Sequence, residues 1–236
     1  MIQVEGLTDR VAVVTGAGRG IGQRIAETLA GNGARVAALD LQAPAHEGIL
    51  GVACDVSDEA AVNGAFDRIE GELGQVSVLV LNAGIFPIVP FEETTTELWN
   101  RTLAINLTGA FLCARRALPG MREAGYGRIV GIGSSAGKAG GARSVAAYAA
   151  SKAGVMTLMK SIANEYAKNG ITANALAPAL IDTDMIANTR DLVSRIPVGR
   201  FGTTDEVAAL VTFLCSAHAG YITGEVTDIN GGFLID

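Results

Sequence analysis

Short apolar runs rich in β-branched residues alternate with amphipathic helical patterns along the whole chain. One run, residues 76–81 (Val-Ser-Val-Leu-Val-Leu), is almost continuously apolar, as expected of a parallel strand buried on both faces. Further strands are predicted at 10–14, 34–39, 49–53, 128–133, 172–176 and 225–229, and helices at 20–30, 59–72, 95–121, 145–168 and 204–216. The sequence therefore predicts an α/β fold: a single doubly wound domain over residues 1–236, with helices on both faces of a parallel sheet of about seven strands.

Residues 183–201 carry no clear periodicity, because Asp, Asn, Arg, Pro and Gly are interspersed there with apolar side chains. The apolar ones include Met185, Ile186, Leu192, Val193 and Ile196. We interpret the segment as a helical flap over the functional site. A plain surface connection is the alternative.

The overall charge excludes some classes of partner. The chain has 236 residues, 49% of them hydrophobic, and a formal net charge of −6. An acidic chain of this kind is not expected to bind nucleic acid or an anionic membrane surface. We expect no signal peptide, because no basic start is followed by an apolar run. We expect no membrane span either, because no apolar run approaches ~20 residues.

The cysteines indicate a reducing compartment. Cys54, Cys113 and Cys215 are odd in number and far apart in sequence. We expect them to be reduced thiols that pack as small hydrophobes in a cytoplasmic protein. The two histidines, His46 and His218, are also isolated, so the sequence predicts no metal site.

A glycine-rich loop joins the first predicted strand to the first predicted helix. Residues 15–22 read Thr-Gly-Ala-Gly-Arg-Gly-Ile-Gly. Glycines let the backbone turn sharply and approach a pyrophosphate, while the helix N-terminus offers unpaired N–H groups and the positive end of its dipole. The placement of the loop predicts dinucleotide binding through Gly16, Arg19, Gly20, Ile21 and Gly22, which is typical of a Rossmann-type domain.

The second predicted strand is followed by Asp40, which is expected to select the cofactor. A carboxylate there can accept hydrogen bonds from both hydroxyls of the adenosine ribose. It would also repel a 2′-phosphate, by about 4 kcal/mol at ~4 Å and an effective dielectric of ~20. Arg19 works against this, because a guanidinium can pair with a 2′-phosphate. Leu41 and Gln42 add no second positive charge, so we predict a preference for NAD(H), with NADP(H) left open.

Polar residues also follow the third and fourth predicted strands. Asp55 follows the third, where its side chain can reach an adenine amino group, and Asn82-Ala83-Gly84 follows the fourth. The carboxyl ends of parallel strands are where such folds bind ligands. Taken singly, each residue would more often be a turn former than a ligand.

A tyrosine and a lysine four positions apart mark the candidate catalytic helix. Tyr148 and Lys152 share one face of the helix predicted at 145–168. An ammonium beside a phenol is expected to lower its pKa from about 10 and so make it a usable acid or base. Ser134, which follows the fifth strand, can hold a substrate oxygen against Tyr148. Ordinary helix packing of the Tyr-Lys pair is the alternative reading, and Ser135 is the alternative serine.

On these motifs the chain resembles the short-chain dehydrogenase/reductase family over essentially its full length. The matching residues are Thr15, Gly16, Gly20, Gly22, Asn82, Ala83, Gly84, Asn106, Ser134, Tyr148, Lys152, Pro178, Asn230, Gly231 and Gly232. The resemblance implies Tyr148 as general acid/base, Ser134 as orienter of the substrate oxygen and Lys152 as ribose anchor. It implies that Asn106 holds a water in a proton relay from Lys152. Further cofactor contacts that it implies are Asp55 and Val56 at the adenine, and Pro178, Ile181 and Thr183 at the nicotinamide.

The sequence departs from the family pattern at three places. Leu81 stands where the family usually has an asparagine, and Ala179 stands where a glycine usually follows Pro178. The spacing from Ser134 to Tyr148 is one residue longer than the commonest one. The Ser-x-x-Gly match to Gly137 nevertheless favours Ser134 over Ser135.

These features predict an NAD(H)-dependent oxidoreductase that interconverts a secondary alcohol and a ketone by hydride transfer. A 3-oxoacyl-thioester reductase that uses NADPH is the alternative, and a non-catalytic dinucleotide-binding subunit is a remote one. We expect a small carbonyl or alcohol substrate in a pocket lined by Phe86, Pro87, Ile88, Val89 and Met185. The resemblance also implies a homotetramer that pairs the helices predicted at 95–121 and 145–168.

Overall fold

The computed structural model describes residues 2–141, 144–183 and 192–235. Its centre is a sheet of seven parallel strands in the order β3-β2-β1-β4-β5-β6-β7. The strands are β1 (Val11–Thr15), β2 (Arg35–Asp40), β3 (Leu50–Ala53), β4 (Val76–Leu81), β5 (Gly127–Ile132), β6 (Ile171–Pro178) and β7 (Val226–Ile229). The strand order reverses between β1 and β4, and this switch point is where doubly wound sheets bind ligands.

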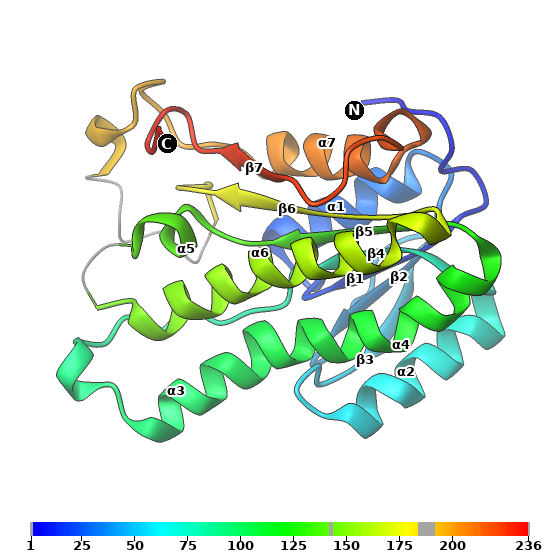
Figure 1. Cartoon of the computed structure of the whole chain (residues 1–236), viewed down its shortest axis with the longest axis horizontal. Helices are drawn as coiled ribbons and strands as arrows, with labels where there is room; N and C mark the ends of the chain where they lie inside the picture. Colours follow the sequence, from blue (N-terminus) through cyan, green and yellow to red (C-terminus); the bar gives the residue numbers. More distant parts are fainter. Residues whose placement is uncertain (1, 142–143, 184–191, 236) are drawn as a thin grey trace.

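Helices cover both faces of the sheet, which confirms the predicted Rossmann-type fold (Figure 1). On one face lie α1 (Gly20–Ala30) and α7 (Thr204–Cys215), and on the other lie α2 (Glu59–Leu73), α4 (Gly109–Ala124) and α6 (Ala146–Tyr166). Shorter helical segments are η1 (Phe91–Glu93), α3 (Thr96–Leu103), η2 (Ala104–Thr108), α5 (Ser135–Ala139), η3 (Ala167–Asn169) and η5 (Ala217–Ala219). Among the described residues, no helix is both long enough and apolar enough to span a membrane.

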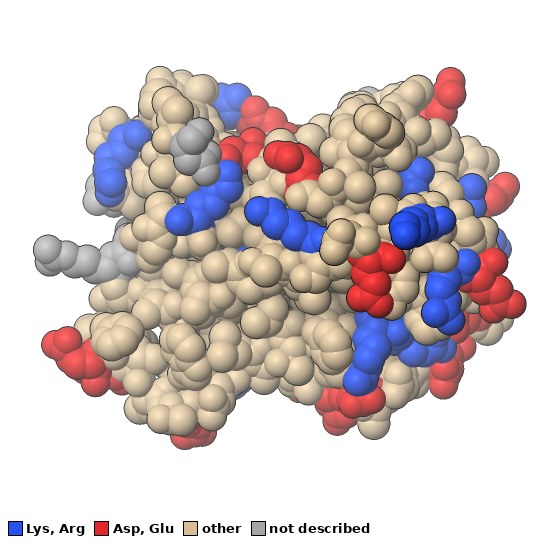
Figure 2. Space-filling model, in the orientation of Figure 1, with Lys and Arg blue, Asp and Glu red and all other residues tan. Residues whose placement is uncertain are grey.

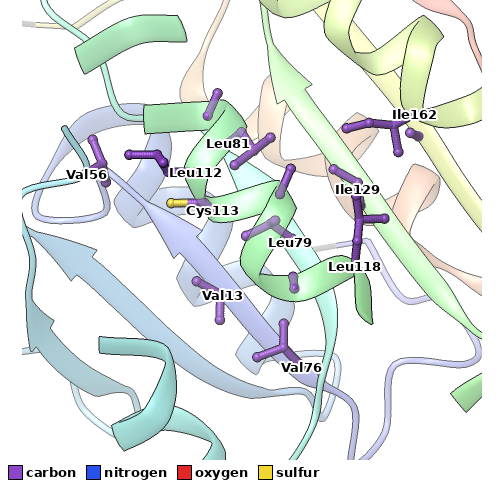
Figure 3. Close-up of a cluster of buried hydrophobic side chains, with 14 of the residues drawn as sticks. Val13, Val56, Val76, Leu79, Leu81, Leu112, Cys113, Leu118, Ile129 and Ile162 are labelled. Atoms are coloured by element: carbon purple, nitrogen blue, oxygen red, sulfur yellow. The ribbon is translucent and has the colours of Figure 1, made fainter. Parts of the chain in front are cut away.

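Alternate residues of the strands feed two separate cores. In β1, Val11 and Val13 pack toward α2, α4 and α6, whereas Ala12 and Val14 pack toward α1 and α7. Figure 3 shows the first core, to which α4 contributes Leu112, Cys113 and Leu118 and β4 contributes Val76, Leu79 and Leu81. Burial on both faces explains why these strands read as continuous apolar runs rather than as alternating ones.

The predicted helix 95–121 is wrong in one respect that bears on function. The rod is continuous, but it consists of α3, the π-helical turn η2 and α4, and it ends at Ala124 before Gly125 at φ 63°. A π turn inserts an extra residue and rotates the side chains around it, and such turns are frequent at functional sites. Here the turn contains the buried Asn106.

Two other boundaries differ from the sequence prediction. Strand β6 continues through Pro178, two residues beyond the predicted end, and pairs with β7 there. Helix α5 was not predicted, because five residues without a large apolar side chain give no helical periodicity. Of the predicted flap, residues 184–191 with Met185 and Ile186 lie outside the described residues. Leu192 and Arg195 line a cavity at the sheet edge, so the flap stays a prediction.

Candidate active site

A cavity of about 510 Å³ opens at the carboxyl ends of β4, β5 and β6. Nine of the predicted site residues line it: Ile21, Asn82, Gly84, Ser134, Tyr148, Lys152, Pro178, Ile181 and Thr183. The structure thus gathers into one space residues from both halves of the chain. The remaining predicted residues lie in the glycine loop, at the end of β2, after β3, after β4 (Ala83), and behind the cavity in η2.

The glycine loop has the form that a pyrophosphate requires. A Cβ on Gly22 would lie 2.1 Å from the carbonyl oxygen of Gly16, and a Cβ on Gly16 would lie 2.7 Å from Cα of Ala83. Gly20 has φ +59°, and a Cβ there would meet only Cγ2 of Thr183, at 3.8 Å. No side chain caps the N-terminus of α1 and its first turn holds no acidic residue. The loop is therefore closed against the protein on one side and open toward an anion on the other, so it fits a dinucleotide.

Asn82 and Thr15 fasten this loop to the centre of the sheet. The Asn82 amide donates to the carbonyl oxygens of Thr15 (3.0 Å) and Gly16 (2.9 Å). The Thr15 hydroxyl accepts from the backbone N–H groups of Asn82 (3.0 Å) and Ala83 (3.1 Å). Asn82 therefore fixes the turn at β1 from the end of β4.

At the end of β2, the Asp40 carboxylate lies directly beside the glycine loop. It accepts hydrogen bonds from the N–H groups of Gly18 and Leu41, both at 2.8 Å. The side chain of Leu41 is 71% exposed, and Arg19 is exposed as well. Asp40 thus places a negative charge beside the glycine loop, held by two backbone N–H groups.

Three further residues near this edge of the sheet, Asp55, Val56 and His46, make contacts within the protein. Asp55 accepts hydrogen bonds from the hydroxyl (2.6 Å) and N–H (2.9 Å) of Ser57, and these bonds lower the pKa of its carboxyl. Val56 is buried and packs against Gly109 of α4. His46, which the sequence reasoning did not assign, places Nε2 3.0 Å from the carbonyl oxygen of Ala17 in the glycine loop. A single histidine in a connection has no spacing pattern that could have revealed this contact.

The catalytic end brings Tyr148 and Ser134 together. Ser134 is 8% exposed, caps α5 by accepting from Ala136 N–H at 3.1 Å, and hydrogen-bonds the Tyr148 hydroxyl. The Phe86 ring meets the Tyr148 ring edge-on, with centroids 4.6 Å apart. Ser135 lines the same cavity, but the contact with the phenol is made by Ser134.

Lys152 is held behind the tyrosine. Its side chain is 5% exposed, and Nζ donates to the carbonyl oxygen of Ile132 at 2.7 Å. Burial lowers the pKa of this ammonium to about 8. The expected lowering of the pKa of Tyr148 by Lys152 is not found: burial raises the pKa of the phenol, and the Ser134 hydrogen bond offsets part of the rise. The reason is geometric, since Nζ is directed to the end of β5 and lies 5.8 Å from the ring centroid.

Asn106 is 1% exposed, and both polar atoms of its side chain have hydrogen-bond partners within the protein. Its Oδ1 accepts from Ile85 N–H (2.8 Å), and Nδ2 donates to the Ile85 carbonyl oxygen (3.0 Å) and to the Ser151 hydroxyl (2.9 Å). A Cβ on Gly84 would lie 3.2 Å from Oδ1 of Asn106 and 3.5 Å from Nζ of Lys152. Asn106 therefore couples the chain after β4 to the catalytic helix.

The residues that the resemblance places at the nicotinamide lie at and after the end of β6. Pro178 ends the strand, Ile181 is 4% exposed and bridges to Gly202, and the Thr183 hydroxyl donates to the Ile181 carbonyl oxygen at 3.3 Å. Ala179 donates its N–H to Ile229 at 3.2 Å and has no positive φ, so the missing glycine costs this turn nothing.

The predicted pocket lining is partly right. Phe86 and Ile88 line the cavity, whereas Pro87 and Val89 do not, and Met185 lies outside the described residues. The sequence reasoning missed Leu192, Arg195, Phe233 and Leu234, which line the cavity from the segment before α7 and from the C-terminal tail. Nothing in their spacing marks them, because they reach the site only through the folding of two irregular segments.

The arrangement defines a class of protein: a dinucleotide-binding α/β enzyme in which a half-buried phenol and a buried serine hydroxyl line one cavity. The family model described as "Enoyl-(Acyl carrier protein) reductase" matches residues 16–234. The chain belongs to the short-chain dehydrogenase/reductase family and is an oxidoreductase of that family.

Named relatives match the chain over nearly its full length. The 3-oxoacyl-[acyl-carrier-protein] reductase MabA of Mycobacterium tuberculosis is 44% identical over 94% of this chain and 92% of its own. The 3-oxoacyl-[acyl-carrier-protein] reductase FabG of Escherichia coli is 39% identical over 94% of this chain and 96% of its own. A cis-4-hydroxycyclohexanecarboxylate dehydrogenase of Sinomonas cyclohexanicum is 39% identical, over 97% and 98%. These relatives favour the thioester reductase, the alternative of the sequence analysis, over a general alcohol dehydrogenase.

Proposed function

We propose that the protein reduces the ketone of a 3-oxoacyl thioester to the 3-hydroxyacyl product, with NADH as the cofactor. The observation that carries the proposal is the Ser134–Tyr148 hydrogen bond in the wall of the 510 Å³ cavity, whose lining contains no carboxylate among the described residues. The relatives named as 3-oxoacyl reductases support the substrate class. The reaction remains the interconversion of a secondary alcohol and a ketone that the sequence predicts.

The raised pKa of Tyr148 suits the reductive direction. A phenol with a raised pKa keeps its proton at neutral pH, so it is ready to donate that proton to an oxygen that gains negative charge. Ser134 donates a second hydrogen bond to the same oxygen and so shares that charge. When bound, the dinucleotide supplies the hydride, and the protein's own part is to hold the ketone between these two hydroxyls.

Lys152 and Asn106 complete the proton path in our proposal. With a pKa of about 8, Lys152 is mostly protonated at neutral pH, and a bound nicotinamide ribose would lie where its N–H groups can reach. A water held near Asn106 would then return a proton to Lys152 from solvent. The nearness of Asn106 and Lys152 to Gly84 supports this relay, because both side chains border the same glycine.

Asp40 is the basis for proposing NADH. Its carboxylate is fixed by the N–H groups of Gly18 and Leu41, so it cannot swing away from the ribose position without losing both bonds. A fixed negative charge accepts hydrogen bonds from ribose hydroxyls and repels a 2′-phosphate. NADPH is the alternative, through the exposed Arg19.

A second candidate is the oxidation of a cyclic secondary alcohol. The dehydrogenase from Sinomonas supports it by its name, and the edge-on contact of Phe86 with Tyr148 supports it by geometry. The two aromatic rings place apolar surface beside the reacting hydroxyl, which suits a cyclohexane ring.

The test is a steady-state panel on the purified protein. Acetoacetyl thioesters and cyclohexanone derivatives are compared in reduction, and the matching alcohols in oxidation, each with NADH and with NADPH. We expect kcat/KM for the thioester with NADH to exceed every other combination by at least about tenfold. A preference of that size for the cyclic substrates would overturn the main proposal in favour of the second candidate.

We also propose a homotetramer that uses the outer face of α4 and α6. Figure 2 shows this side of the molecule, and much of the surface over α4 and α6 carries no charge. A groove of about 300 Å³ lies between these helices. Its apolar lining includes Phe111, Leu118, Leu158, Ile162 and Tyr166, and Arg115, Arg122, Ser161 and Glu165 also line it. Phe111 in this groove is 43% exposed, so a partner on this face would bury its apolar ring.

The cysteines support the cytoplasm as the place of the reaction. Cys54, Cys113 and Cys215 are all free and buried. Burial raises the pKa of Cys54 to about 11 and those of Cys113 and Cys215 to about 12. Thiols in this state are inert and need no disulfide, as expected in a reducing compartment. Among the described residues, no group of three or more His, Cys, Asp or Glu is placed to hold a metal ion.

A further inference from the structure

The charge of the cavity is opposite to that of the chain. The protein has a net charge of −6, yet the only charged side chains among the described residues that line the cavity are two cations, Lys152 and Arg195. Lys152 is buried and committed to the carbonyl oxygen of Ile132. Arg195 lies at the exposed side of the cavity, so its charge is the one that an entering molecule meets.

Arg195 also differs from the arginines around it. Arg200, five residues later, is neutralised by Glu206, with nitrogen–oxygen distances of 2.7 and 2.9 Å. For Arg195, no carboxylate of the described chain lies within ion-pair distance, and its guanidinium instead lies over the Phe233 ring, 5.3 Å from the centroid. A guanidinium that lies over an aromatic ring and has no carboxylate partner among the described residues can present its N–H fork to a planar anion.

The positions of Arg195 and Phe233 are fixed by contacts between the segment before α7 and the C-terminal tail. Ile196 is 5% exposed, and its Cγ2 lies 2.9 Å from where a Cβ on Gly231 would be. Val198 donates its N–H to the Gly231 carbonyl oxygen at 3.1 Å. Asn230 donates to the Leu234 carbonyl oxygen at 2.7 Å and so folds the tail that carries Phe233. The segment before α7 and the C-terminal tail thus hold each other, and Arg195 and Phe233 with them.

We propose that Arg195, supported by Phe233, is a specificity-determining residue that binds an anionic group of the substrate, a phosphate or a carboxylate remote from the ketone. The inference rests on the proposed function, because it names a chemical feature of the substrate of that same site. Two sources fit this chemistry: the phosphate of a phosphopantetheine thioester and the carboxylate of a cyclic oxo acid. A guanidinium binds either in the same two-pronged way.

Binding to the dinucleotide-saturated protein tests the inference without turnover. Calorimetry compares two matched pairs: 4′-phosphopantetheine with pantetheine, and cyclohexanecarboxylate with its methyl ester. In the wild-type protein we expect the anionic member of one pair to bind about 10- to 100-fold more tightly than its neutral partner, and the pair that responds identifies the source. Arg195→Met should abolish the difference, whereas Arg195→Lys should keep part of it.

Lys168→Met is the matched control, since it removes an exposed cation of η3 that does not line the cavity. Equal binding within both pairs, or an anion preference that survives in Arg195→Met, would overturn the inference. So would a loss of dinucleotide affinity in Arg195→Met, because the arginine would then serve the cofactor. The proposed function is tested separately by reduction of a neutral acetoacetyl thioester by the wild-type protein and by Lys168→Met. That substrate carries no anionic group, so failure of this reaction would count against the proposed function and not against the role of Arg195.

Discussion

The two ends of the site are built in opposite ways. At the catalytic end, Asn106 and Lys152 are 1% and 5% exposed and bond to the backbone at the ends of β4 and β5. At the phosphate-loop end, which we define as Gly18, Asp40, Leu41 and His46, the polar groups are half-buried or exposed. They bond only to neighbouring loop backbone.

Because of this difference, we expect the two ends to determine different properties of the enzyme. A buried polar group must keep every partner, because an unsatisfied one costs about 1–3 kcal/mol, so the catalytic end joins activity to stability. An exposed charge is screened and solvated, so the phosphate-loop end can select a cofactor without holding the fold together. Substitutions at the two ends should therefore separate rate, stability and selectivity.

The largest effect is expected from Tyr148→Phe. Loss of the phenol proton should lower kcat about 10²- to 10⁴-fold, because the acid role has no substitute in the described cavity. Dinucleotide affinity, measured by fluorescence titration, should stay within about twofold of wild type. Tyr221→Phe, at a fully exposed tyrosine, is the control and should change neither value. A Tyr148→Phe variant with wild-type kcat would contradict the role of Tyr148 as the proton donor.

Asn106→Ala should destabilise the protein most. The change leaves the N–H and carbonyl of Ile85 and the hydroxyl of Ser151 without their present partner. We expect the free energy of unfolding to fall by about 2–4 kcal/mol in urea denaturation. Asn100→Ala, on the exposed side of the same rod, is the matched control and should cost under about 1 kcal/mol. Equal losses in the two variants would contradict the difference between buried and exposed polar groups.

The same contrast explains how far the sequence reasoning reached. Tyr148 and Lys152 were predictable because helix periodicity fixes their common face, and the motif around Ser134 indicated its place at the end of β5. The strand runs were predictable because burial on both faces leaves only apolar residues in them. Asn106 was identified by resemblance, but its π turn was not, since one inserted residue hardly alters an apolar pattern.

At the phosphate-loop end the residues were predictable but their contacts were not. Asp40 was placed by its position after β2, whereas its bond to Gly18 depends on the conformation of a glycine loop. The contacts of His46 with Ala17 and of Arg195 with Phe233 join segments without periodicity. Such contacts arise from tertiary packing of irregular backbone, for which a single sequence carries no regular signal.

Asp40→Ser should change selectivity and leave stability almost unaltered. Removing the carboxylate ends the repulsion of a 2′-phosphate, so the ratio of kcat/KM for NADPH to that for NADH should rise about 10- to 100-fold, less than the unscreened charge interaction allows. The free energy of unfolding should change by less than about 1 kcal/mol. Glu47→Gln removes an exposed negative charge from the same connection and should shift the ratio only slightly. An unchanged ratio in Asp40→Ser would mean that Arg19 governs the choice.

The smallest effect is expected at Glu206, in an exposed polar network beyond both ends of the site. Glu206 completes the capping box of α7 with Thr203 and pairs with Arg200, and these hydrogen bonds lower the pKa of its carboxyl to about 2. A carboxyl whose pKa is lower in the folded than in the unfolded protein stabilises the fold above its ordinary pKa of about 4.3, and this contribution is lost as the pH falls toward 2. Glu206→Gln should therefore lower the free energy of unfolding by about 1 kcal/mol at pH 7, and the difference from wild type should vanish near pH 2.

Glu123→Gln, at an exposed glutamate outside the ion pairs of the described chain, should show no such pH dependence. A Glu206→Gln loss above about 3 kcal/mol would mean that an exposed network can stabilise as much as the buried one around Asn106, and the contrast between the two kinds of polar site would not hold.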